Sequence, residues 1–562
     1  MSSRSGGTAE TVPVLIAGGS LVGLSTAMFL GWHGVESLAV ERHESTAIHP
    51  RAGHFQLRTV EILRSVGLEE AVRRKSEEQY DPDGGINNVE SLAGKEIANY
   101  FPSLNAGVEE FSPTVRVFIN QDALEPILAA RAKELGARLR YTTELRSFEQ
   151  DDNGVTALVR DLQSGVESTV RANYLVAAEG NRSQTREALG VGMHGHGLLS
   201  ESITIYFHSD WDLEPLLRDR NQGVNYVTSP VLRGFFRLNR SGNAGFLVVN
   251  LVGDTARPEV VAAYPDAPWA NVAAGITEER CLELLRAAIG VPGIPVTVDD
   301  VAPWRAVADS ADVYQVGRVF IVGDAAHVVP PNGGFGGNTG IQDAHNLAWK
   351  LALAVKGVAG AELLATYDAE RRPVGDLTVE QAYTRYVTRV APYLGTDGMQ
   401  PLLDDFSMEI GYRYNSAAIV PEEGATEALL HEHPRESHGR PGSRAPHVWI
   451  ERAGERLSTL DLFGRRFVLL VGPAGDAWCE AVRPAARALG IELDAYRVGD
   501  GGELADPDAR FSEAYGISST GAVLVRPDDF VGWRAKDGAR ASEDAARAAL
   551  GALICAGTAV RA

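Results

Sequence analysis

The feature that most constrains the fold is a strand, turn, helix and strand pattern close to the N-terminus. The apolar segment Val12–Ala17 leads into the glycine-rich turn Gly18–Gly23, then into apolar residues at helical spacing and a second apolar segment closed by Glu41. In a parallel βαβ unit, such a turn brings a pyrophosphate against the helix N-terminus, while the acidic residue bonds a ribose. The pattern therefore predicts a dinucleotide-binding sheet. The expected contacts are Gly18, Ser20, Leu21, Val22, Gly23 and Glu41.

The turn differs from the usual three-glycine pattern at one position, where Ser20 replaces the second glycine. Because that glycine lets the backbone approach the pyrophosphate, we expect the approach to be slightly less free here. Gly18 and Gly23 keep the tight turn and the contact between helix and strand, so we interpret Ser20 as a tolerated variant.

A second segment, residues 317–353, combines a short buried strand, an acid, a turn rich in Pro and Gly, and a helix. The strand ends at Asp324, whose carboxylate can bond a polyol or ribose hydroxyl. Two prolines fix the backbone of the turn 330–338, and its glycines let a flat ligand approach the main chain. The helix that follows presents its positive N-terminal end to the same ligand. A plain surface turn is the alternative, but it does not require these features together.

These segments resemble the flavin-binding motifs of the class A flavoprotein monooxygenases, the aromatic hydroxylases of para-hydroxybenzoate hydroxylase type. The chain length and the stretches 18–30 and 40–52 are most similar to the aromatic polyketide hydroxylases, such as the tetracenomycin and aklavinone hydroxylases. The resemblance implies bound FAD, transient reduction by NADPH, with NADH as the less expected donor, and O2 as co-substrate. Oxygen would add to the flavin C4a carbon, and the hydroperoxide would hydroxylate a polycyclic aromatic polyketide in antibiotic biosynthesis, without a protein acid, base or nucleophile.

The resemblance also implies roles for individual residues. Asp324 would hold the ribityl chain of the flavin, and Gln121 would lie against the flavin. Arg51 would contact the flavin or its pyrophosphate, with Arg58 as the second choice. Glu179 stands where the third motif of the family has Asp and serves the flavin and the nicotinamide cofactor. The other residues implied for cofactor binding are Arg42, Leu145, Pro331, Gly336, Gly337 and Asn338. The oxygen pocket would be formed by Pro331, Gly334 and Gly336.

The composition changes after the third motif. Residues 191–303 contain segments that alternate with period two, which predicts an antiparallel sheet with a face free to cover the flavin and bind substrate. The candidate substrate contacts are Tyr226, Phe235, Phe246 and Trp304. The predicted fold class is therefore α/β plus β, with a Rossmann-like FAD-binding domain in two parts, 1–190 and 304–400, around this substrate domain.

The C-terminal part is expected to be separate. Residues 401–445 are rich in Glu, His, Pro and Gly and predict a linker. Residues 446–562 resemble the thioredoxin-like C-terminal domain of larger family members. Cys479 falls where the redox pair would lie, but residue 482 is Val, so the CxxC motif is missing and a structural or dimer-contact role is expected.

Charge and composition exclude several classes of protein. The net charge of -21, from 53 basic and 74 acidic residues, argues against nucleic acid or an anionic membrane as a partner. The 3 cysteines are widely spaced, so we expect neither a disulfide framework nor a metal site. No apolar run reaches the roughly 18 residues of a membrane helix. We expect a cytoplasmic enzyme with a small-molecule substrate, with a homodimer as one option.

Three alternatives stay open. The flavin hydroperoxide could attack a ketone, giving a Baeyer–Villiger or ring-opening oxygenation. The chain could instead be a flavin dehydrogenase or reductase that uses no oxygen. The departures at Ser20 and Glu179 also leave the option of a binding protein that keeps the fold without catalysis.

Overall fold

A mixed sheet with a parallel centre forms around the first predicted strand. The computed structural model describes residues 10–220, 222–253, 271–424 and 429–556. Strand β1 (Glu10–Ala17) pairs in parallel with β2 (Ser37–Val40) and β8 (Glu167–Ala177), and its central side chains are covered on both faces. The strand order is β14-β15-β8-β1-β2-β5, and β7 and β6 extend the sheet from β8. The remaining strands are β5 (Arg138–Arg140), β6 (Thr143–Asp151), β7 (Gly154–Asp161), β14 (Gln315–Val316) and β15 (Val319–Ile321).

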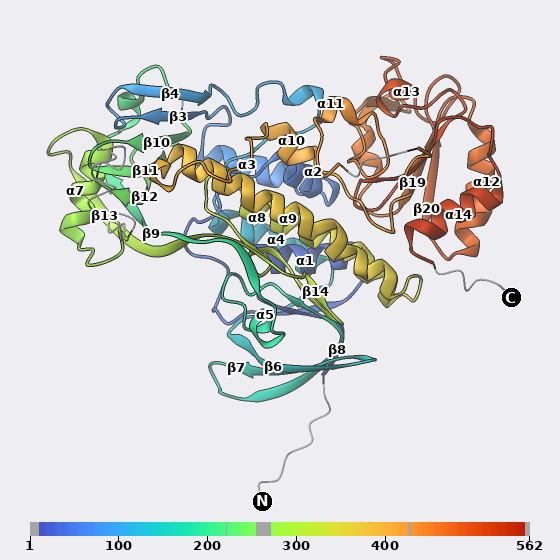
Figure 1. The fold of residues 1–562 in the computed structure, drawn as a ribbon, viewed down its shortest axis with the longest axis horizontal. Helices are drawn as coiled ribbons and strands as arrows, with labels where there is room; N and C mark the ends of the chain where they lie inside the picture. Colours follow the sequence, from blue (N-terminus) through green and yellow to red (C-terminus); the bar gives the residue numbers. More distant parts are fainter. Residues whose placement is uncertain (1–9, 221, 254–270, 425–428, 557–562) are drawn as a thin grey trace, which may run out of the picture.

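Helices pack on this sheet and carry the chain toward the C-terminal half. Helix α1 (Leu21–Trp32) begins at the glycine turn and packs against α4 (Gln121–Glu134) and α8 (Phe335–Val355). Helix α9 (Ala361–Arg389) packs on α8 and runs across the molecule in Figure 1. No helix in the described ranges is long and apolar enough to cross a membrane. The other helices here are α2 (Leu57–Ser65), α3 (Glu69–Gln79) and α5 (Gln184–Ala188).

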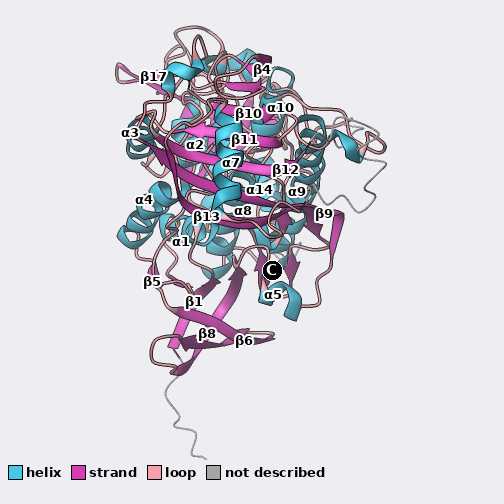
Figure 2. Cartoon of the chain, turned by 90° about the vertical axis from the view of Figure 1, so that its left-hand side faces the viewer, coloured by secondary structure: helices cyan, strands magenta, loops and turns pink. Residues whose placement is uncertain are grey.

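A second sheet has the order β16-β13-β9-β12-β11-β10-β3-β4 and is antiparallel except between β10 and β3. Helix α7 (Glu278–Ile289) lies over one face of it, as Figure 2 shows, and shares an apolar core with that face. The opposite face meets α9. The strands are β3 (Ile86–Val89), β4 (Glu96–Phe101), β9 (Met193–Ser209), β10 (Val224–Thr228), β11 (Leu232–Leu238), β12 (Ala244–Val252), β13 (Val296–Ala311) and β16 (His327–Val328).

This second sheet extends beyond the boundaries predicted for it. Strands β3 and β4 join it from within residues 1–190, and β13 continues past residue 303 to Ala311. The sequence of β3, Ile-Asn-Asn-Val, has no apolar alternation, because its strand character comes from pairing with the distant β10. Such pairing leaves no local signal in the sequence.

The C-terminal part contains a four-stranded sheet in the order β20-β19-β21-β22, seen at the right of Figure 1. Helices α12 (Asp476–Ala488) and α14 (Glu543–Leu553) share a buried core with this sheet. Cys479 lies on α12 and forms no disulfide. The strands of this four-stranded sheet are β19 (Phe467–Val471), β20 (Leu493–Arg497), β21 (Ala522–Val525) and β22 (Val531–Ala535). A separate two-stranded sheet is formed by β17 (Trp449–Arg452) and β18 (Glu455–Ser458). A short helix, α13 (Phe511–Ala514), precedes β21.

The segment predicted as a linker, 401–445, contains two continuous buried runs, 407–414 and 441–445. It contains α10 (Asp405–Ile410) and α11 (Pro434–Ser437). Tyr414 is buried and stacks on Phe530 of the C-terminal part, with ring centroids 4.0 Å apart. The structure thus differs from a solvated linker. Its buried aromatic residues are scattered among Pro, Gly and Glu without helical or strand spacing, which explains why composition indicated a linker.

Candidate active site

The glycine-rich turn leaves no room for side chains at its two key positions. Gly18 has a φ of +102°, and a Cβ atom there would lie 2.3 Å from the carbonyl oxygen of Ala178. A Cβ atom on Gly23 would lie 2.0 Å from the carbonyl oxygen of Gly18. Helix α1 begins at Leu21 without a side-chain cap, so its first backbone N–H groups are available to an anion.

Ser20 is bound into a buried polar cluster. Its hydroxyl donates to the carboxylate of Glu125 at 2.5 Å and accepts from the amide of Gln121 at 3.1 Å. Glu125 is fully buried and also accepts from Gln121 and from the backbone N–H of Ala47. The serine therefore belongs to a network that joins the turn to α4. Sequence reasoning missed Glu125, although it lies four residues after Gln121 on the same face of a helix.

Glu41 closes β2 as predicted and faces the glycine turn. Its carboxylate accepts from the backbone N–H of Gly19 at 2.7 Å and of His43 at 2.9 Å. Arg42 and Arg51 are exposed and form no ion pair with the described residues, so both remain free to meet a phosphate. Leu145 is buried in the apolar core that includes the end of β2.

Asp324 fits the predicted role of a hydroxyl acceptor. It follows Gly323, which has a φ of +60°, and its side chain stays accessible although protein atoms surround it. Burial raises the pKa of Asp324, and the charges of His327 and Arg51 oppose this. The carboxylate accepts no hydrogen bond from the described residues. A cofactor with a polyol chain can satisfy it, so the residues present fit a flavin.

The Pro/Gly turn is held in shape by Asn338. The side-chain amide of Asn338 donates to the carbonyl oxygens of His54 and Gly334, and its oxygen accepts from the backbone N–H of Gln56 at 2.9 Å. Asn338 therefore ties the segment after Arg51 to the start of α8. The side chain predicted to bind cofactor is largely engaged with the protein backbone. Pro331, Gly334, Gly336 and Gly337 lie on this turn and the first turn of α8.

The four aromatic residues predicted to contact substrate lie in the second sheet, and three form a row on one face. The ring centroids of Tyr226 and Phe235 are 5.9 Å apart, and those of Phe235 and Phe246 are 6.2 Å apart. Trp304 donates from its indole nitrogen to Thr204 at 3.1 Å. The amide of Asn332 donates to the Tyr226 hydroxyl at 3.4 Å, so the aromatic face meets the Pro/Gly turn.

Arg389 completes this group and was missed in the sequence. Its guanidinium lies over the rings of Tyr100 and Tyr226, 5.1 and 5.6 Å from their centroids. Burial lowers the pKa of Arg389, but Tyr226, Asp405 and Tyr100 more than offset it, so the pKa is raised. Arg389 forms no ion pair with a described carboxylate. Arg389 reaches Tyr226 because it lies at the end of α9, and the spacing of residues in the sequence does not indicate this contact.

The side chains of Glu179 and Arg58 contact other protein groups and not the predicted cofactor site. The Glu179 carboxylate accepts from the Ser183 hydroxyl at 2.6 Å and from the Thr185 backbone N–H at 3.1 Å, so it serves the start of α5. This use differs from the predicted cofactor contact, although Glu179 does follow the residue that packs on Gly18. Arg58 is fully buried and pairs with Asp529 at 3.0 Å, so its guanidinium is engaged within the protein and is not available for the cofactor contact given as its second choice.

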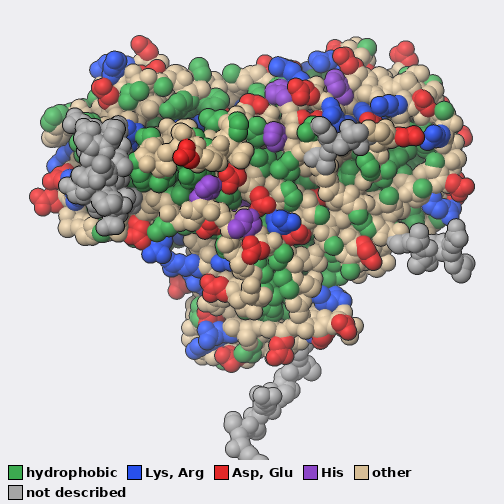
Figure 3. Space-filling view, in the orientation of Figure 1, with side chains coloured by type: hydrophobic (Ala, Val, Ile, Leu, Met, Phe, Trp, Pro, Cys, Tyr) green, Lys and Arg blue, Asp and Glu red, His purple; other side chains and the backbone are tan. Residues whose placement is uncertain are grey.

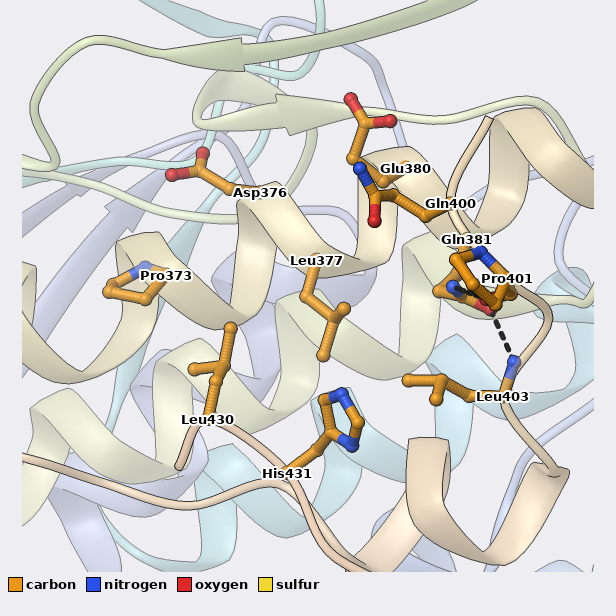
Figure 4. A pocket seen from close by; sticks show the side chains of 10 residues that line it. All are labelled: Pro373, Asp376, Leu377, Glu380, Gln381, Gln400, Pro401, Leu403, Leu430 and His431. Atoms are coloured by element: carbon orange, nitrogen blue, oxygen red, sulfur yellow. Dashed lines mark hydrogen bonds between the residues drawn. The ribbon is translucent and has the colours of Figure 1, made fainter. Parts of the chain in front are cut away.

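A surface pocket of about 470 Å³ lies elsewhere, along α9 (Figure 4). Its lining includes Asp376, Leu377, Leu403 and His431, and none of the predicted site residues belongs to it. On the face drawn in Figure 3, acidic and basic side chains are interspersed, so the net negative charge is not gathered in one patch there. Within the described residues, no cluster of three or more His, Cys, Asp or Glu could hold a metal ion.

An anion-binding glycine turn, an unpaired acid beside a Pro/Gly turn and an aromatic sheet face together define a flavin-dependent oxidoreductase. Comparison with known families agrees with this class. Residues 11–382 match the family model of an FAD binding domain, and residues 438–555 match that of the aromatic-ring hydroxylase C-terminal domain. The chain belongs to the FAD-dependent aromatic-ring hydroxylases, and it is a monooxygenase that uses FAD and O2.

Individual relatives cover nearly the whole chain. It is 56% identical to the 4-methyl-5-nitrocatechol 5-monooxygenase of a Burkholderia species, over 97% of this chain and 98% of that protein. It is 39% identical to the tetracenomycin A2 monooxygenase-dioxygenase of Streptomyces glaucescens, over 94% of each. A solved ternary complex of aklavinone-11 hydroxylase with FAD and aklavinone matches 99% of this chain and 100% of that one, with a TM-score of 0.87 and 36% identity. The predicted family and the FAD cofactor are thus confirmed.

Proposed function

We propose that this enzyme hydroxylates an ionised phenolic ring at a carbon ortho or para to the phenol oxygen, with NADPH as electron donor. The observation that carries the proposal is the cationic Arg389 over the ring of Tyr226, where the aromatic face meets the Pro/Gly turn. When bound, FAD supplies the activation of O2. The protein residues supply binding, orientation and charge.

Arg389 is suited to hold a phenolate. A buried or partly buried cation normally has an anionic partner in direct contact. Arg389 forms no ion pair with a described residue, because the nearby Asp405 pairs with Arg385 at 3.1 Å. The ionised oxygen of a phenol can provide this partner while Tyr226 donates a hydrogen bond to it. Ionisation makes the ring carbons ortho and para to the phenol oxygen electron-rich, which is the state that accepts oxygen. Arg389 and Tyr226 thus both orient the ring and stabilise its reactive form.

The remaining residues of the site fix the plane of the ring and limit its contact with water. Tyr226 and Phe246 are buried, so a flat ligand on this face loses much of its hydration. Trp304 is held by its bond to Thr204 at the neighbouring strand. In the proposed reaction FAD occupies the glycine-rich βαβ unit, so NADPH binds only transiently and outside that unit.

For the substrate class we favour a monocyclic catechol with an electron-withdrawing substituent. The 56% identical relative is named for a nitrocatechol. One structural observation agrees with this. Asn332 is fully buried beside Tyr226, and its Oδ1 atom has no hydrogen-bond partner among the described residues, so the second hydroxyl of a catechol that reached it would supply the missing donor.

A polycyclic aromatic polyketide, the substrate predicted from the sequence, is the second candidate. The rings of Tyr226, Phe235 and Phe246 form a continuous row that offers contact to several fused rings. Relatives named for such substrates include the tetracenomycin A2 enzyme. Hydroxylation of a phenol is common to both candidates.

Replacement of Arg389 tests the proposal. We expect Arg389→Met to lower kcat/KM for 4-methyl-5-nitrocatechol about 100-fold, because a charge interaction of a few kcal/mol is lost. Arg389→Lys should recover part of this loss. FAD content should stay the same in both. The control is Arg372→Met, which removes a cation that pairs with Asp368 and Asp376 on the same helix.

The same assay with aklavinone separates the two substrate classes. A higher kcat/KM for the nitrocatechol supports the monocyclic class, and a higher value for aklavinone supports the polyketide. Equal kcat/KM values of wild type and Arg389→Met on both compounds would contradict the role of Arg389.

A further inference from the structure

Asp343 is a buried carboxylate for which the proposed chemistry has no direct use. It lies on α8 and has no exposed surface. It accepts hydrogen bonds from the backbone N–H of Gly323 at 3.0 Å, from His327 Nε2 at 2.7 Å and from Arg371 Nε at 2.8 Å. Three donors from three different elements therefore converge on one carboxylate beside Asp324.

These bonds fix the backbone conformation immediately before Asp324. Gly323 has a positive φ, and its N–H is held by Asp343. Helix α8 approaches this turn closely, because a Cβ atom on Gly340 would lie 3.1 Å from the Cα atom of Gly323 and 2.6 Å from Val22. Arg371 also donates to the carbonyl oxygen of Thr339 at 3.2 Å. The network thus sets the turn and the first turns of α8 relative to each other.

The charges around Asp343 favour its ionised form, as these hydrogen bonds require. Burial raises the pKa of Asp343, but His327 and Arg371 more than offset it and hold the pKa below its usual value. Asp343 is therefore an anion that neutralises Arg371 inside the protein. The Asp324 carboxylate lies close to the first turn of α8, 3.8 Å from where a Cβ atom on Gly336 would be. A change in the network would move both groups that face the flavin.

We propose that Asp343 and His327 are positioning residues for FAD, which hold Asp324 in place for the ribityl chain. The proposal rests on the assignment of Asp324 to that chain, and it does not depend on the substrate. A carboxylate is needed at 343, because an amide cannot neutralise Arg371 while accepting from all three donors.

Two variants of His327 isolate the hydrogen bond. The amide nitrogen of His327→Gln can take the place of Nε2 and donate to Asp343, whereas His327→Met has similar bulk and no donor. Loss of one charged hydrogen bond should weaken FAD binding about tenfold or more in the Met variant. The Gln variant should bind FAD within about threefold of wild type. FAD release from the diluted holoenzyme is followed by flavin fluorescence.

The control for Asp343→Asn is Asp368→Asn, at a carboxylate that has similar donors and is partly exposed. Asp368 likewise accepts from a backbone N–H, that of Tyr314, and pairs with an arginine, Arg372, but it does not touch Gly323. We expect faster FAD release and an altered flavin absorbance spectrum for Asp343→Asn, and wild-type values for Asp368→Asn.

The proposal is overturned if both His327 variants release FAD at the wild-type rate, or if the Gln and Met variants are equally impaired. Unfolding temperatures of the apoproteins are measured alongside. If Asp343→Asn fails to fold, the His327 pair still decides the question. These measurements need no substrate, so failure of the proposed hydroxylation would be seen separately.

Discussion

Among single residues, Asp324 has the most direct link to the cofactor. It is accessible, accepts no hydrogen bond from the described residues and follows a glycine with positive φ. We predict that Asp324→Ala is purified with little or no FAD, because the ribityl hydroxyls lose their acceptor. The ratio of flavin absorbance to protein absorbance measures this. A ratio equal to that of wild type would contradict the placement of the ribityl chain.

Some residues of the site could be predicted from the sequence and others could not. The roles expected of Gly18, Gly23 and Glu41 follow from a local pattern, and the structure places them around one turn. Asn338 lies in the expected place, but its side chain holds the backbone. Arg389 and Asp343 could not be found, because their partners Tyr226 and Gly323 come from other elements and no spacing records such contacts.

At the level of elements, α10 gives a pH-dependent contact with α2. Glu409 is buried, accepts from the backbone N–H of Leu57 at 3.0 Å and pairs with Arg116 at 2.8 Å. Burial raises the pKa of Glu409 from 4.5 to about 7, although Arg116 opposes the shift. Between these two pH values the folded protein binds more protons than the unfolded chain, so stability falls as pH rises.

We predict that Glu409→Gln reduces this loss of stability between pH 5 and pH 8 by about 3 kcal/mol, because the neutral amide does not titrate. Urea unfolding of both proteins at several pH values provides the measurement. Other titrating groups contribute equally to the wild type and to Glu409→Gln. The difference between the two slopes of unfolding free energy against pH therefore measures the contribution of Glu409. Identical slopes would show that Glu409 keeps an ordinary pKa in the folded protein.

Elements were easier to predict where their pattern is local. The strands of the second sheet between residues 202 and 251 alternate with period two, and β9 to β12 contain them. Strand β3 and helix α10 were not predicted, because one depends on a distant partner strand and the other has only 6 residues.

For the whole molecule, a buried charge network joins the C-terminal part to the flavin-binding part. Glu370 of α9 accepts from Arg526 at 2.6 Å and from Lys350 of α8 at 2.7 Å, and all three are fully buried. Arg526 follows β21, so residues 156 positions apart form this contact. The prediction of a linker at 401–445 failed for the same reason, because contacts with residues distant in the sequence cannot be recognised from local composition.

We predict that Arg526→Ala lowers the free energy of unfolding by about 3–5 kcal/mol, because Glu370 and Asp528 lose a buried counter-charge. Arg547→Ala, which removes an exposed pair on α14, is the control and should change little. Denaturant unfolding measures both. A similar small effect for the two variants would show that the network does not hold the parts together.

The C-terminal part is expected to act through such contacts and not through thiol chemistry. Burial raises the pKa of Cys479 to about 11, although Arg483 opposes the shift, so the thiolate that redox exchange needs is scarce at neutral pH. We predict that Cys479→Ser has the same kcat and FAD content as wild type. A large loss of kcat would show that this thiol takes part in turnover.

The central claim, hydroxylation of a phenol with an oxygen atom from O2, is tested most directly by isotope labelling. The FAD-loaded enzyme is supplied with NADPH and 4-methyl-5-nitrocatechol or aklavinone under ¹⁸O2, and the product is analysed by mass spectrometry and for ring connectivity. We predict a product with one ¹⁸O atom newly bonded to a ring carbon, with release of nitrite where that carbon carried the nitro group, and no product without O2. Product formed in the absence of O2, or a new oxygen without the label, would contradict the account.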